Sequence, residues 1–231
     1  MKICCPMPTL LLAAWFFATP AIAQDGEQSR YYVQQMIELA AANNDPGVTT
    51  MQRMLEQNPK PAPPDPAGGR AALQRGLAAL QRNELETALS AFQQASRADP
   101  GNVDAVNHLG LVYRKLGRLA EAESALQQAL VLEPARAVAW FQLAQVYGLQ
   151  HDARRALGAL ANTYRFAQNP MRAEEILRNI AENEAADTLR NAALETLRLY
   201  GLPAAAAIVP PLPANPGTVP LNVPSGSVRA P

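Results

Sequence analysis

The sequence predicts an all-α fold, a right-handed solenoid of about three stacked helical hairpins with additional helices at its C-terminal end. Apolar residues recur at helical spacing through almost all of residues 70–200, and proline there occurs only at expected turns. The chain is rich in Ala and Leu and only 6% aromatic, a composition that favours helices over strands. It also aligns with itself at a step of about 34 residues, which is typical of stacked two-helix units.

The first 23 residues have the pattern of a secretory signal peptide. Lys2 supplies a positive charge, and residues 10–17 form an apolar run that is too short to span a bilayer as a helix. Ala21-Ile22-Ala23 then matches a small-residue cleavage site. We expect residues 1–23 to be removed and the protein to be exported, with a periplasm as the expected compartment and no stable membrane insertion afterwards. An uncut N-terminal anchor is the alternative.

Cleavage after Ala23 would also remove both cysteines of the chain, Cys4 and Cys5. The mature protein would then have no disulfide, although an exported protein usually meets a compartment that permits one. Its stability would therefore come from packed helices alone.

Residues 24–58 are expected to form an N-terminal helical hairpin. Gln24 to Ser29 is polar and predicted to be irregular, and Arg30 to Asn43 carries an apolar stripe at helical spacing. Asp45 followed by Pro46 predicts the start of a second helix, with Asp45 as the N-cap and Pro46 in the first turn.

Two proline-rich stretches are expected to bound the repeat domain. Residues 59–69 hold five prolines and are predicted to be a linker, because proline blocks helix interiors. The hairpin before this linker could dock back onto the array or stand apart from it. Residues 201–231 are expected to be a disordered tail, since they lack the apolar content that a packed core needs.

The repeat places similar residues at equivalent positions of three units, about 69–102, 103–136 and 137–170, which a diverged pair of capping helices at 171–200 follows. Small residues allow the two helices of a unit to approach closely, bulky ones fill the seam between them, and the turn residues tolerate positive φ. In phase are Gly76, Gly110 and Ala144; Ala88, Ala122 and Ala156; Phe92, Leu126 and Leu160; and, at the turn, Asn83, Gly117 and His151.

This pattern resembles the tetratricopeptide repeat family over roughly residues 69–168. The family's W-x2-L-G-x2-Y pattern corresponds to Val106, Leu109, Gly110 and Tyr113 in the second unit, and to Trp140, Leu143, Ala144 and Tyr147 in the third. The resemblance implies a superhelix whose concave face, lined by the first helix of each unit, holds a peptide or a partner helix. Asn107 would be able to hydrogen-bond a peptide backbone, and Arg114 to meet an acidic group. The candidate groove residues are Leu73, Leu77, Leu80, Asn107, Leu111, Arg114, Phe141 and Gln145.

Several other classes of function are disfavoured. The formal net charge is zero, so the sequence lacks the basic excess typical of nucleic-acid-binding proteins. It contains no phosphate-binding loop, zinc-protease helix or nucleophile elbow, and its two histidines have no acidic or cysteine partners at metal-ligand spacing. We therefore expect no cofactor, metal or catalysis. The favoured function is a protein-interaction scaffold of the cell envelope. The alternative is a structural or accessory subunit of an envelope enzyme or assembly complex.

Overall fold

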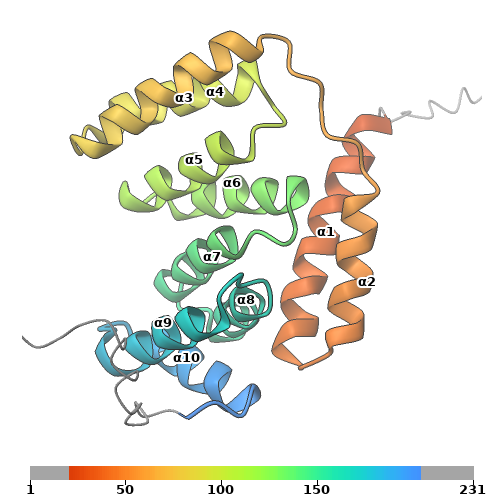
Figure 1. Ribbon diagram of the computed structural model, residues 1–231, viewed down its shortest axis with the longest axis vertical. Coiled ribbons are helices and arrows are strands. Elements are labelled where there is room, and N and C mark those ends of the chain that lie inside the picture. Colours follow the sequence, from red (N-terminus) through yellow and green to blue (C-terminus); the bar gives the residue numbers. More distant parts are fainter. Residues whose placement is uncertain (1–20, 204–231) are drawn as a thin grey trace, which may run out of the picture.

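The computed structural model describes residues 21–203, and these residues contain ten helices and no strand, which confirms the all-α prediction (Figure 1). The predicted signal segment up to residue 20 and the predicted tail from residue 204 lie outside this range. The helices are α1 (Ala21–Ala41), α2 (Asp45–Glu56), α3 (Pro66–Gln81), α4 (Leu85–Ala98), α5 (Val103–Lys115), α6 (Leu119–Leu132), α7 (Ala137–Leu149), α8 (Ala153–Arg165), α9 (Pro170–Asn183) and α10 (Asp187–Leu199).

Three helical hairpins, α3–α4, α5–α6 and α7–α8, stack in sequence order, and each packs on the next through α4 with α5 and α6 with α7. Small residues bring the two helices of a hairpin together, as the repeat predicts. A Cβ added to Gly76 would lie 2.5 Å from Cε1 of Phe92, and one added to Gly110 would lie 2.5 Å from Cγ of Leu126. In these two units a larger residue would fit only if the bulky side chain shifted.

The turns between the helices of each unit share one backbone conformation. Asn83, Gly117 and His151, the residues that the repeat aligns, have φ of 57°, 74° and 60°. Asn43, between α1 and α2, has φ of 54° and so makes the same kind of turn. Asparagine, histidine and glycine adopt this left-handed region more readily than β-branched residues do.

Two N-terminal predictions need correction. Gln24 to Ser29 is not irregular, because α1 begins at Ala21 and runs through it without interruption. The N-cap of α2 is Asn44, whose side chain accepts a hydrogen bond from the Gly47 amide, so Asp45 is already the first helical residue.

The predicted linker 59–69 is also too long, because α3 begins at Pro66. Asp65 caps this helix by accepting a hydrogen bond from the Gly68 amide at 2.9 Å. Proline needs no amide partner at the first helical position and its fixed φ suits the helix. The last proline of the run therefore starts a helix, and the two glycines that follow continue it.

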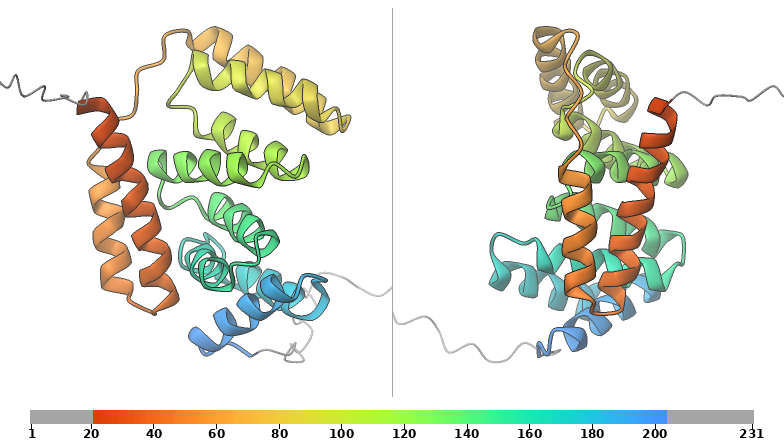
Figure 2. Two further views of the ribbon diagram at one scale, coloured as in Figure 1. Left: turned by 180° about the vertical axis from the view of Figure 1, so that it is seen from behind. Right: turned by 90° about the vertical axis from the view of Figure 1, so that its right-hand side faces the viewer.

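The N-terminal hairpin docks onto the array, a question that the sequence left open. Helix α1 packs against α8 and contacts α6, and α2 also contacts α6 (Figure 2). The backbones approach closely at Gly158, where an added Cβ would lie 2.1 Å from the carbonyl oxygen of Ile37. One helical turn further on, Nδ2 of buried Asn162 donates to the carbonyl oxygen of Met36 at 3.1 Å.

Two ion pairs flank this contact. Glu38 accepts from Nε of Arg154 at 2.6 Å, and Asp45 pairs with Arg165. Apolar side chains of α1 and α2 lie in the same buried cluster as those of the second and third units, so the hairpin shares the main core.

The hairpin occupies the side formed by the second helices of the units. First helices α5 and α7 contact one another directly, whereas α1 contacts both α6 and α8. In a curved stack the elements on the inside lie closer together, so α5 and α7 belong to the concave side. Helix α10 closes the far end of the array by packing on α7, α8 and α9, and Tyr200 just beyond it donates to the carbonyl oxygen of Ala161 at 3.1 Å.

Replacing Gly158 with alanine should destabilise the protein by about 2 kcal/mol, because the new methyl group would force α1 away from α8. Urea unfolding measures the change, and hydrogen exchange should show faster exchange of the α1 amides. Gly26→Ala is the matched control. It lies in α1 with nothing within 4 Å of an added Cβ, so it should leave stability unchanged or raise it by about 0.5–1 kcal/mol. An equal effect of the two substitutions would contradict the close-approach argument.

Candidate functional site on the concave face

The first helices carry all eight candidate groove residues, but the structure does not bring them into one cavity. Seven of them are half-buried, while Asn107 is only 2% exposed. Its carboxamide thus lies inside the scaffold, where Oδ1 has no hydrogen-bond partner among the described residues. A ligand on the surface would not reach Asn107 in this arrangement.

An apolar hollow on this side surrounds Phe141. It has a volume of about 480 Å³ and lies between the first turns of α7, the end of α8 and the first turns of α9. Val138 is 54% exposed beside it, so part of this apolar surface faces solvent directly. The apolar side chains that line the hollow are Ala135, Ala137, Val138, Phe141, Phe166, Ala167, Ala173 and Ile176.

Two arginines lie at the edge of the Phe141 hollow. Arg136 is already neutralised, since it pairs with Asp104 and, at 3.0 Å, with Glu133. Arg172 makes no ion pair within residues 26–203. The hollow therefore combines an apolar lining with one positive charge available to a ligand.

Arg114 and Gln145 lie near one another. They line a second, smaller cavity of about 100 Å³, which Glu184 and the start of α10 complete. Arg114 is half-buried and its Nε has no hydrogen-bond partner in the described part of the chain. Burial lowers the pKa of its guanidinium, and within residues 26–203 Arg114 makes no ion pair. This is the second positive charge on the face that lacks a partner.

The three candidate leucines of the first unit contribute to packing inside the array. Leu73, Leu77 and Leu80 pack against the buried cluster that includes Ala79 and Phe92. Leu111 is half-buried on α5, three residues before Arg114.

Sequence reasoning missed Val138, Phe166, Arg172 and Ile176. Val138 lies three residues before Phe141, and so on the same side of α7, which is a signal that helical periodicity carries. The others come from α9 and the end of α8, where the repeat pattern has diverged and phase no longer predicts position.

The described residues also bear on metal binding and membrane crossing. Within residues 26–203 no group of three or more His, Cys, Asp or Glu side chains is close enough to hold a metal ion. Between residues 21 and 203, no helix combines the length and apolar character needed to cross a membrane.

His108, the remaining polar group of interest on α5, packs between units. Its ring stacks on Phe92 with centroids 5.1 Å apart, and its Nδ1 has no hydrogen-bond partner in the described part of the chain. Burial lowers the pKa of this imidazole, an effect that Arg136 reinforces and Asp104 opposes.

Stacked helical hairpins with a constant stride and a capped end define an α-solenoid repeat protein. The family model described as tetratricopeptide repeat matches residues 38–103, 73–137 and 109–170, which together span more than half of the chain. The chain belongs to the tetratricopeptide repeat family. Domains of this family generally bind other proteins, so this chain is classed with protein-interaction scaffolds.

Several solved structures are similar to this chain at low identity. A crystal structure of MamA protein is 19% identical with a TM-score of 0.48, covering 75% of this chain and 90% of that one. A tetratricopeptide repeat protein from Parabacteroides merdae is 14% identical with a TM-score of 0.44, covering 75% of this chain and 74% of that one. A mutant O-GlcNAc transferase from Thermobaculum terrenum is 21% identical with a TM-score of 0.45; the match covers 58% of this chain and only 26% of the transferase. No curated protein matches the chain.

Stability should fall as the pH drops from 7.5 to 5.5, because His108 has a lower pKa in the folded chain than its ordinary value of about 6.5. The unfolded chain then binds more protons below about pH 6.5, which favours unfolding. Urea midpoints across this range measure the effect. His108→Phe, which keeps an aromatic ring against Phe92, should flatten the profile. His151→Asn should keep the slope, since asparagine also accepts positive φ; a slope that His108→Phe leaves intact would refute the assignment.

Proposed function

We propose that this protein is a non-catalytic adaptor of the cell envelope that binds a peptide or helix of a partner protein on its concave face. One observation carries the proposal: α1 and α2 dock on the side of α6 and α8 and so do not cover the inner face of α5 and α7, where α10 packs only against the end of α7. That face carries an apolar hollow around Phe141 and, at Arg114, a half-buried cation without an ion-pair partner in the described residues.

The chemistry of this face favours a ligand with apolar side chains and an acidic group. Aromatic and branched side chains around Phe141 offer burial to one or two apolar side chains of the ligand. Arg172 at the rim and Arg114 on α5 would pair with carboxylates, and an arginine that is already partly desolvated gains more from such a pair than a solvated one.

The envelope setting rests on the N-terminal pattern of Lys2, the apolar run 10–17 and Ala21-Ile22-Ala23. In the uncut chain, Ala21-Ile22-Ala23 begins α1. Removal up to Ala23 would leave the rest of α1, including all of its core-forming residues from Val33 onward, in the mature protein.

A photoreactive residue at position 111 should crosslink the partner in cell extracts, whereas the same residue at exposed position 120 on α6 should not.

The captured protein, once purified, should bind the full chain, and Arg114→Glu should weaken this binding at least about tenfold by replacing attraction with repulsion. Isothermal titration calorimetry measures the affinity, with Arg53→Glu at an exposed position of the docked helix α2 as the charge-matched control. Equal losses in both variants would contradict binding on the concave face. Capture only of neighbouring copies of this chain would instead support the alternative of a structural subunit, one that assembles with itself.

Expression of the full chain in a Gram-negative bacterium should give a mature protein that begins at Gln24. Intact-mass spectrometry of the periplasmic fraction checks the cleavage point. Ala23→Arg should block processing and leave the precursor on the membrane, because the cleavage position accepts only small residues. A full-length cytoplasmic product of the unmodified sequence would rule out export.

A further inference from the structure

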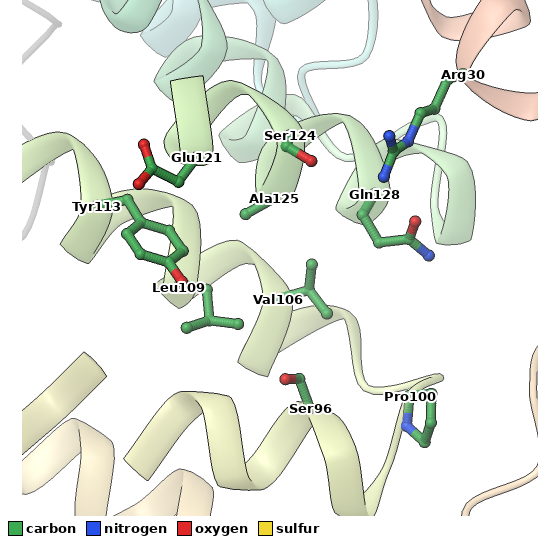
Figure 3. Close-up of a pocket in the computed structure, with 10 residues that line it drawn as sticks. All are labelled: Arg30, Ser96, Pro100, Val106, Leu109, Tyr113, Glu121, Ser124, Ala125 and Gln128. Carbon is green, nitrogen blue, oxygen red and sulfur yellow. The ribbon is translucent and has the colours of Figure 1, made fainter. Parts of the chain in front are cut away.

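A second hollow, of about 420 Å³, lies on another side of the repeat array, between α4, α5 and α6 (Figure 3). Val106 and Leu109 of α5 form its apolar floor. Ser124, Ala125 and Gln128 of α6 form one wall, and Arg30 of α1 lies at its edge. None of the predicted groove residues lines it.

The wall on α6 repeats the surface of α8 that receives α1. One repeat step of about 34 residues separates the two sets. On α8 all three positions are buried beneath α1, whereas on α6 all three remain half-buried. The corresponding pairs are Ser124 with Gly158, Ala125 with Ala159, and Gln128 with Asn162.

The features that hold α1 on α8 have counterparts in the hollow. Small residues on α8 let the α1 backbone approach, and Ser124 and Ala125 are the small residues on α6. Asn162 donates its carboxamide to a main-chain carbonyl of α1, and Gln128 carries the same group one methylene further out.

Charge is available in the hollow as well. Arginines of the array pair with acidic residues of the docked hairpin, as Arg154 does with Glu38. In the hollow, Arg30 makes no ion pair within residues 26–203, and since it belongs to α1 it links this surface directly to the α1 interface.

We propose that the hollow between α4 and α6 is a second docking site, which accepts an amphipathic α-helix of a partner protein beside α1. The docked helix carries an apolar stripe with the spacing of Val33, Met36, Ile37 and Ala40, and an acidic residue at the end that faces Arg30. It comes from another polypeptide, because those four residues of α1 are already buried against this chain.

The probe is a fluorescein-labelled peptide of residues 27–43, which has the required stripe and the acidic Glu38. Fluorescence anisotropy with the full chain should show saturable binding. Ala125→Arg, which fills the hollow, should weaken binding at least about tenfold. Ala120→Arg, the same substitution at an exposed position of the same helix, should leave it unchanged, as should Phe141→Arg on the concave face. Circular dichroism confirms that each variant is folded.

Ser124→Gly provides a test that does not depend on a disruptive side chain. It introduces the residue that α8 has at the equivalent position, so the peptide should bind about threefold more tightly.

Absence of saturable binding would overturn the proposal. An affinity that Ala125→Arg leaves unchanged would also overturn it, because the peptide would then have displaced α1 from α8. A dimer of the full chain that Ala125→Arg dissociates in sedimentation would also overturn it, in favour of a second copy.

Discussion

The close approach of paired helices at small residues is the constraint on which the rest of the structure depends. The side chains of Phe92 and Leu126 pack against Gly76 and Gly110 of the partner helix. In these two hairpins a bulky residue on the second helix therefore fills the space left by a glycine on the first. Because this arrangement recurs at one stride, successive hairpins present similar surfaces to their neighbours. A stack with one curved inner face follows from that regularity, as it does in repeat proteins generally.

The same kind of contact decides which surface of the array is free. At Gly158 the backbones of α1 and α8 approach closely, and Asn162 adds a hydrogen bond from its side chain to a main-chain carbonyl of α1. The hairpin is thereby committed to the second helices of the units. The hairpin therefore leaves the inner face of α5 and α7 free.

Local information predicted most of the fold. Helical periodicity, the residues at the three turns and the paired small and bulky positions all concern interactions within one unit, and the structure confirms them. The docking of α1 was left open because it depends on residues far apart in the chain, Gly158 and Ile37 among them. Asn107 shows the same limit: phase places it on the correct helix, but its burial depends on packing between units, which the pattern of one helix does not record.

The concave face is preorganised by contacts that lie behind it. Glu123 of α6 accepts hydrogen bonds from Arg155 of α8 at 2.8 Å and from Gln150, at the end of α7, at 3.0 Å. Arg155 also lies over the ring of buried Tyr147, 4.5 Å from its centroid. These contacts fix the second unit relative to the third. Since Arg114 belongs to the second unit and Phe141 to the third, the separation between the cation and the apolar hollow is set before any ligand arrives. A peptide that fits both then loses less free energy to ordering the scaffold than it would on units free to move.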